Sequence, residues 1–303
     1  MIIPLDQEHT RAWISLYKKF YAQFPWNINT GIEQIRNLTT EAKNTESWIF
    51  IDEKKVTAIG TLTADDDRHN GTVQNFAFSP KDIDNASKLL KHLLTRAKIW
   101  KLETVTTTTW ENVGSIQKLL TDAGFHFKNQ MALMHLNPAN IKIPDKEQYF
   151  TIRSLADGLS IDAFVESNHI AFAEDSSRPL EKIELERWID SIPGFHADMQ
   201  LAAIIDEKIV GTVMSEIEEI KKEDSISRHA WIYGFGVVPE ARRRGIATHL
   251  LRELSCRFSV YGVSDIWALT DFEGPIRLFY EAVGFTYQTN WIEFAHDFDL
   301  SLN

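Results

Sequence analysis

Apolar residues in the second half of the chain recur at the spacing of an α-helix and at that of a β-strand. The helical spacing is clearest over residues 245–257, where one face would carry Ile246, Leu250, Leu251 and Leu254. Strands are predicted on either side of this helix, at 227–238 and 263–270. The pattern therefore predicts a strand, a helix and a second strand in succession.

A second helix is predicted over 274–285, with Pro275 in its first turn and Gly284 at its C-terminal stop. Residues 286–298 then return as a strand. The first half repeats this coarse order of hairpin, strand ending at proline, helix, strand, helix and last strand. Strands that alternate with helices around a mixed sheet predict an α/β (α+β) fold.

The two halves also resemble each other in sequence. Residues 48–62, WIFIDEKKVTAIGTL, are similar to residues 202–214, AAIIDEKIVGTVM. Asp52 and Asp206 of these stretches are 154 residues apart. Further on, Pro80 matches Pro239 at an offset of 159, and Gly124 matches Gly284 at an offset of 160. Three similarities in the same order indicate a duplicated domain.

The segment 137–148, NPANIKIPDKEQ, contains two prolines and lacks a sustained apolar period, which is typical of a linker. We therefore predict a first domain over residues 1–140, a linker over 141–148 and a second domain over 149–303. Each domain is expected to build its own mixed, mostly antiparallel sheet with helices beside it.

Composition and charge narrow the functional classes. A chain of 303 residues with 44% apolar residues is long enough for two globular domains. Its net charge of −11 disfavours nucleic-acid binding and favours a cationic substrate. Neither a membrane-spanning run nor a secretory start is present, and the single cysteine fits a reducing compartment. We expect a cytoplasmic protein without a nucleic-acid or membrane partner; the sequence carries no signal for its oligomeric state.

Three arginines stand where a helix begins, which raises an electrostatic question. The N-terminus of a helix already carries about half a positive charge, so Arg242, Arg243 and Arg244 are unfavourable there unless an anion binds. A phosphate would accept hydrogen bonds from the free N–H groups of the first turn. Gly245 would let it approach the backbone closely. The alternative is that the arginines form a solvated surface turn.

The same residues resemble a family signature. The stretch from Val238 through Pro239 and Arg242-Arg243-Arg244-Gly245-Ile246-Ala247 looks like the acyl-CoA signature of the GNAT superfamily of N-acetyltransferases. A second motif of that family, a helix ending in Leu-Tyr-Glu-x-x-Gly-Phe, is similar to residues 279–285, FYEAVGF. The resemblance covers about residues 149–300, whereas the first half shares only the layout.

The resemblance implies that acetyl-CoA binds where two parallel strands splay apart. The main chain of Val237 and Val238 would then pair with the pantetheine arm. The following turn would hold the pyrophosphate through its backbone N–H groups and the hydroxyl group of Thr248. The residues of this turn are Arg242, Arg243, Arg244, Gly245, Ile246, Ala247 and Thr248. The acceptor would be a primary amine, possibly cationic, on a small molecule; a protein or peptide acceptor and a noncatalytic acyl-CoA-binding protein are the alternatives.

Tyr280 falls on the tyrosine that protonates the departing thiolate in this family, so the resemblance implies that role here. Its spacing with the apolar residues of its helix also allows it to be a core aromatic. The general base stays open, because the strand leading to Val238 offers no acid. His229 and Glu216 are the candidates.

Other features are expected to be structural. Ten histidines give no cluster at metal-ligand spacing, so no metal is predicted. Cys256 is expected to be a buried or half-buried, inert thiol. In the first half, Ala86 stands opposite Gly245 and Leu120 opposite Tyr280, so that domain is predicted neither to bind acyl-CoA tightly nor to catalyse.

Overall fold

A computed structural model of the chain describes residues 1–22, 44–65, 69–141, 149–173, 181–192, 194–222 and 225–298. Two compact units are found, one made of Met1–Met131 and Thr289–Asn303, the other of Ala132–Gln288. Among the described residues, no helix combines the length and the apolar character that a bilayer crossing needs. Residues 142–148 of the predicted linker lie outside the described part.

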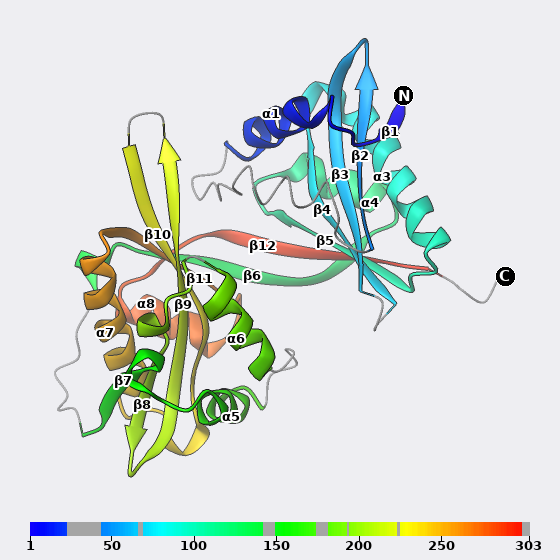
Figure 1. Cartoon of the computed structure of the whole chain (residues 1–303). Helices are drawn as coiled ribbons and strands as arrows, with labels where there is room; N and C mark the ends of the chain where they lie inside the picture. Colours follow the sequence, from blue (N-terminus) through cyan, green and yellow to red (C-terminus); the bar gives the residue numbers. More distant parts are fainter. Residues whose placement is uncertain are drawn as a thin grey trace. The chain divides into compact units, whose positions relative to one another are not determined.

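The first unit is a mixed sheet with helices packed against it (Figure 1). Its strands follow the order β1-β2-β3-β4-β5-β12, in which β4 and β5 are parallel and every other neighbouring pair is antiparallel. The elements are β1 (Ile2–Pro4), α1 (Thr10–Tyr21), β2 (Thr45–Asp52), β3 (Lys55–Asp65), β4 (Asn70–Phe78), α3 (Ile83–Ile99), β5 (Thr104–Trp110), α4 (Gly114–Asp122) and the part of β12 (Thr286–Asp297) that lies in this unit.

The second unit repeats this plan with the strand order β7-β8-β9-β10-β11-β6. β10 and β11 are its parallel pair. Its elements are β7 (Thr151–Ser154), α5 (Ile161–Ala171), α6 (Lys182–Ser191), β8 (Leu201–Ile205), β9 (Lys208–Lys222), β10 (Ser225–Val237), α7 (Ile246–Val260), β11 (Val263–Asp271), α8 (Pro275–Val283) and the part of β6 (His126–Leu136) that lies in this unit.

The predicted helix around residues 246–254 packs as its spacing indicates. The apolar face of α7 is at most 1% exposed and joins a core with side chains of β9, β10 and β11, such as Val213, Ile232 and Ile266. The opposite face of the sheet packs on α5 and α6 through a second cluster that includes Phe164, Leu185 and Met214. The sheet of this unit is therefore covered by helices on both faces.

The duplication is visible in backbone details as well as in the order of elements. The β2–β3 turn has Glu53 and Lys54 at positive φ, and the β8–β9 turn has Asp206 and Glu207 at positive φ. In both units the strand before the proline carries a β-bulge with a left-handed residue, Asn75 in β4 and Gly234 in β10. Sheet strands rarely hold such residues, so the shared bulge supports a common origin of the units.

The compact units divide the chain differently from the predicted domains. Trp291–Asp297 of β12 pair antiparallel with Trp110–Thr104 of β5 and so belong to the first unit. β6, the last strand of the first half, is instead the neighbour of β11 in the second unit. The expectation that each half ends with its own last strand is therefore wrong: the two final strands are exchanged. Either strand can form the hydrogen bonds at the edge of either sheet, because backbone groups make them.

This exchange predicts that the first unit needs the C-terminal strand. A chain that ends at Gln288 loses the partner of β5, so amides of Thr104–Trp110 that pair with β12 should exchange with solvent about 10-fold faster or more. Amides of α7 should keep their protection. Hydrogen exchange read by mass spectrometry measures both, with a chain that ends at Phe298 as the control. Unchanged protection of β5 in the shorter chain would contradict the exchange.

Candidate functional site

The two parallel strands of the second unit separate toward their C-terminal ends. Their ladder runs from Arg228 opposite Val263 to Ile232 opposite Ala268. Beyond these residues β10 continues to Val237 and β11 to Asp271, and no further pair between them is found in this described part of the sheet. The end of β10 therefore borders a gap on the side of β11, into which a ligand could fit beside the strand.

A β-bulge produces the separation. Tyr233 lies opposite Met214 and Gly236 opposite Thr212, so β10 contains one residue more than β9. Gly234 has φ +45° there, and a Cβ at this position would collide with the methyl group of Met214. Glycine suits this position, because a larger residue would adopt a disfavoured φ and Met214 would have to move.

Asn168, a buried residue of α5, holds the bulge in place. Its Nδ2 donates to the carbonyl oxygen of Gly234 at 3.0 Å and lies 3.2 Å from Oγ1 of Thr212. Gly236 follows, and a Cβ there would come within 2.8 Å of Cβ of Ala171 and 2.9 Å of the Phe172 ring. The glycine pair thus lets the end of α5 approach the strand closely.

A cavity of about 800 Å³ opens at this place. It combines the end of α5, the splayed part of β10, the turn before α7 and the starts of α7 and α8. Its lining residues are Ala171, Phe172, Phe235, Gly236, Val237, Ala241, Arg242, Arg243, Gly245, Ile246, Ala247, Thr248, Asp271, Pro275, Ile276 and Phe279. Sequence reasoning predicted the middle of this list and missed the walls from α5, β11 and α8.

The start of α7 has the geometry of an anion-binding nest. Arg243 has φ +63° and Gly245 has φ +86°, so two left-handed residues precede the helix. The first intrahelical bond is donated by His249 to the carbonyl of Gly245 at 3.1 Å. The amides of Ile246, Ala247 and Thr248 therefore lie ahead of the hydrogen-bonded part of the helix, and Gly245 brings no side-chain cap. These amides and the helix dipole favour an anion at the cavity's edge.

The three arginines have different surroundings. Arg242 donates from Nε to the carbonyl of Val237 and from Nη2 to the carbonyl of Ala171, both at 3.0 Å, and so ties the turn to β10 and α5. The guanidinium of Arg244 lies 4.6 Å from the centre of the Tyr149 ring, in a cation–π contact. Arg243 is exposed and lines the cavity. Of the three, Arg243 is best placed to reach an anion in the cavity, because Arg242 already holds the backbone and Arg244 packs on Tyr149.

The structure separates the two valines that were predicted to bind through their main chain. Val238 donates its N–H to the carbonyl of Val210 at 3.0 Å, and its carbonyl accepts from Ala241. Since successive residues of a strand direct these groups to opposite sides, Val237 faces the gap toward β11. Val237 lines the cavity, whereas Val238 does not and has no N–H to offer a ligand.

Tyr280 lies in the core next to the cavity. It is 3% exposed, and its ring contacts those of Phe235, Phe279 and Phe285. Burial raises the pKa of its phenol well above the usual range, so the hydroxyl is protonated at neutral pH. Phe279, rather than Tyr280, is among the lining residues. The expected proton-donor role of Tyr280 stays a prediction.

Two glutamates lie on the other face of the sheet, near the bulge. Tyr233 donates its hydroxyl to Oε2 of Glu216 at 3.3 Å. Burial raises the pKa of Glu216, and burial together with the charge of Glu216 raises the pKa of Glu218 to about 7. His229, the other base candidate, lies 3.4 Å from Oδ2 of Asp265.

The remaining expectations have mixed outcomes. Cys256 is exposed on α7, so the prediction of a buried or half-buried thiol is wrong: its position falls outside the stripe of α7 that packs on the sheet. The described residues contain no group of three metal-binding side chains. Glu273, where the family often has asparagine, is exposed. The net acidity of residues 166–190 also predicts that Glu174 and Asp175 help to attract an amine, and both lie outside the described residues.

The first unit lacks the nest. Its helix α3 begins at Ile83, the counterpart of Arg242 at the 159-residue offset, so the turn that forms the nest in the second unit is helical here. Asp82 caps this helix and Asp84 lies in its first turn. Ala86 is fully buried, and Leu120, which corresponds to Tyr280 at the 160-residue offset, is 1% exposed.

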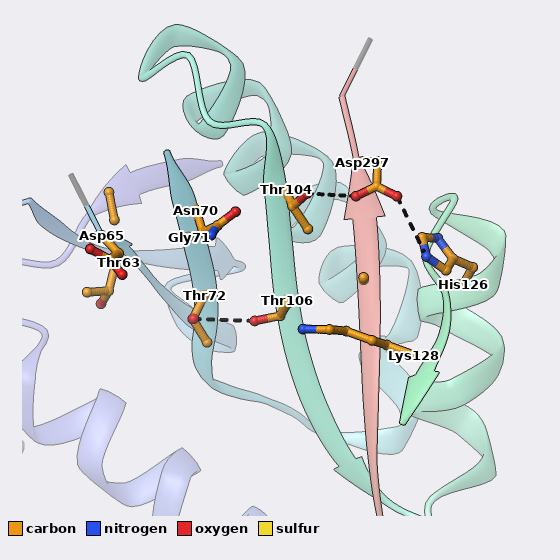
Figure 2. A pocket seen from close by; sticks show the side chains of 12 residues that line it. Thr63, Asp65, Asn70, Gly71, Thr72, Thr104, Thr106, His126, Lys128 and Asp297 are labelled. Atoms are coloured by element: carbon orange, nitrogen blue, oxygen red, sulfur yellow. Dashed lines mark hydrogen bonds and ion pairs between the residues drawn. The ribbon is translucent and has the colours of Figure 1, made fainter. Parts of the chain in front are cut away.

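A polar cavity of about 550 Å³ lies at the other end of β4 and β5 in the first unit (Figure 2). Hydroxyl groups of neighbouring strands face each other there, with Oγ1 of Thr72 and Thr106 3.4 Å apart. Thr104 donates to Asp297 at 2.7 Å, and His126 lies 3.7 Å from the same carboxylate. These contacts join β4, β5, β6 and β12 across the floor of the cavity, so the C-terminal strand is tied in by side chains as well.

Comparison with known proteins agrees with this geometry. Residues 162–285 match the family model of the acetyltransferase (GNAT) family. This part of the chain is a GNAT acyltransferase domain. The matched segment holds the bulge, the nest and Tyr280. No curated protein matches the chain significantly.

Solved structures extend the likeness to the whole chain. A GCN5-related N-acetyltransferase from Sphaerobacter thermophilus is 18% identical with a TM-score of 0.72, covering 100% of this chain and 98% of that one. A tandem GNAT protein from the clavulanic acid biosynthesis pathway is 15% identical with a TM-score of 0.70, and the match covers 98% of each chain. At these identities the likeness establishes the fold, which is that of two GNAT-like units in tandem.

A third structure shares the fold within a larger protein. It is the glucosamine N-acetyltransferase region of a fungal multi-domain β-N-acetylglucosaminidase, 11% identical with a TM-score of 0.72. The match covers 97% of this chain and 38% of the fungal one.

The pair of glutamates beside the GNAT site makes stability depend on pH. The folded protein holds the Glu218 proton more tightly than the unfolded chain, so this carboxyl destabilises the fold increasingly as pH rises from about 4.5 to about 7. Glu218→Gln removes the charge and keeps a hydrogen-bond acceptor. We expect it to raise the free energy of unfolding by about 1–2 kcal/mol near pH 8, after allowance for partial exposure, and to change little near pH 4. Urea unfolding at both pH values measures this; an equal effect at both would contradict the raised pKa.

Proposed function

We propose that the second unit transfers the acetyl group of acetyl-CoA to a primary amine, by direct attack in a ternary complex. One observation carries this proposal: a single cavity joins the nest at the start of α7 to the open edge of β10. A diphosphate bound at the nest would leave a pantetheine arm free to run along Val237. The GNAT family match supports acetyl-CoA as the donor.

The residues present fit such a donor. The amides of Gly245, Ile246 and Ala247 supply donors for phosphate oxygens, and Thr248 adds a hydroxyl. Val237 offers its backbone N–H at the splay, and the Phe172 and Phe235 rings give an apolar wall. In the second step, the phenol of Tyr280 would donate a proton to the departing thiolate as charge develops on sulfur.

The acceptor is proposed to be a small primary amine that carries a positive charge. The net charge of −11 supports attraction of a cation, and Glu216 and Glu218 lie beside the splay. We propose that the first unit is structural, which its acidic helix start and its missing tyrosine support. A reducing compartment such as the cytoplasm completes the proposal, supported by the single cysteine.

The nest is tested through Gly245. Valine is strongly disfavoured at φ +86° and would place a Cβ among the amides. We expect Gly245→Val to weaken acetyl-CoA binding about 10-fold or more, measured by calorimetry. Gly262→Val is the matched control, since Gly262 is a left-handed glycine (φ +69°) at the other end of the same helix. If the wild-type protein gives no heat with acetyl-CoA, or if both variants lose affinity equally, the proposed cradle is wrong.

The role of Tyr280 is tested by Tyr280→Phe, which keeps the ring and removes the proton. Free CoA release with acetyl-CoA and a panel of primary amines should fall about 100-fold or more in kcat, while affinity for acetyl-CoA stays within about twofold. Tyr261→Phe, which removes a hydroxyl bonded to Asp198 outside the cavity, should leave the rate unchanged. Unchanged turnover in Tyr280→Phe would show that this tyrosine only packs. Activity on peptides alone would point to a protein acceptor, and binding without turnover on any acceptor to a noncatalytic acyl-CoA-binding protein.

A further inference from the structure

The acceptor side of the splay carries acids on the strand next to β10, not on β10 itself. Ala230 and Ile232 of β10 belong to the core beneath α7, so the alternation of a strand places Trp231 and Tyr233 on the opposite face, that of α5. In the antiparallel ladder, Glu216 of β9 lies opposite Trp231. Acid and aromatic side chains therefore share this face.

Glu216 lies close to the opening between the strands. Tyr233, whose hydroxyl bonds to Glu216, is the residue immediately before the bulge at Gly234. Met214, two residues before Glu216 on the same face of β9, contacts the bulge directly. One repeat of the pleat, about 7 Å, thus separates the row of Glu216 from the row that borders the splay. A glutamate side chain and an amine bound between them can span that distance.

The surroundings of Glu216 suit a base. Its carboxyl is half-buried beside Tyr233, and Glu218 follows on the same face of β9, opposite His229. The next strand brings Asp265, which is 2.7 Å from His135 and 3.4 Å from His229. Burial raises the pKa of Glu216, and the hydrogen bond from Tyr233 partly offsets that rise.

We propose that Glu216 is the general base of the acyl transfer and that Tyr233 is a positioning residue that orients its carboxylate. This inference rests on the proposed function. It places the base on β9, because β10, the strand leading to Val238, has no acid.

The proton balance follows directly. The acceptor arrives as an ammonium ion and gives one proton to the carboxylate of Glu216, which leaves a neutral amine. The nitrogen attacks the thioester carbonyl, the C–N bond forms and the C–S bond breaks. The nitrogen loses its second proton, the thiolate takes up one, and the products are an amide and CoA thiol, with one proton released to solvent.

His229 is the weaker candidate on geometry. It lies opposite Glu218, one row farther from the splay than Glu216. Its Nε2 is near Asp265, on the side of β11. A base there would have to act across Trp231 and Tyr233, whereas Glu216 already contacts Tyr233.

The experiment compares two acceptors of different basicity. Butylamine is an ammonium ion at neutral pH and needs a base before attack, whereas 2,2,2-trifluoroethylamine is largely uncharged. We expect Glu216→Gln to lower kcat/KM for butylamine about 100-fold, and for trifluoroethylamine less than about 5-fold. Glu219→Gln is the matched control: Glu219 adjoins the pair on β9, is exposed and bonds Arg228. It should leave both rates unchanged.

A second variant keeps the inference testable if Glu216→Gln folds poorly. Tyr233→Phe keeps the ring and removes the hydroxyl that donates to Glu216, so the pKa of Glu216 rises and the acidic limb of the kcat/KM profile for butylamine should move to higher pH. Equal losses for both amines in Glu216→Gln, or an unmoved limb in Tyr233→Phe, would overturn the assignment of the base while leaving the proposed function intact. If the wild-type protein binds acetyl-CoA yet transfers to no amine, the proposed function itself fails.

Discussion

The opening between β10 and β11 depends on one local constraint, the bulge of β10 at Gly234. Asn168 holds the bulge carbonyl, and a side chain at Gly234 would strike Met214. Because the extra residue shifts the strand, its ladder with β11 ends at Ile232, and Val237 faces a gap instead of a residue of β11. The cavity, its apolar walls and the position of the nest at its edge all follow from this shift.

Comparison of the two units separates this constraint from ligand binding. The first unit keeps the bulge, with Asn75 at φ +52°, and its strands β4 and β5 also stop pairing after Val73 and Thr107. What it lacks is the left-handed turn, since α3 starts four residues earlier in register than α7 and has acids at its start. The separation of the two parallel strands is thus common to both units. The nest at the start of α7 is the feature that suits the second unit to a diphosphate.

Local sequence patterns were enough to predict much of this arrangement. The spacing of Leu250, Leu251 and Leu254 identifies the buried face of α7, and the Arg-rich turn with Gly245 indicates an anion site by itself. The exchange of β6 and β12 was not predictable, because each strand has the same local pattern whichever sheet it joins. Nor was the clamp made by Arg242, whose partner Ala171 lies 71 residues away. The bulge glycine Gly234 is visible in the sequence, but the reason for it is a tertiary contact.

The placement of acid and phenol bears on how one small opening can handle two protons. Tyr280 belongs to the core on the α7 side of the sheet, whereas Glu216 lies on the face of α5. A thioester held at the edge of β10 would therefore have its sulfur toward one face and its carbonyl open to the other. The proposed proton donor and the proposed proton acceptor would then approach the reacting atoms from opposite faces of the sheet, so neither would occupy the space that the other needs.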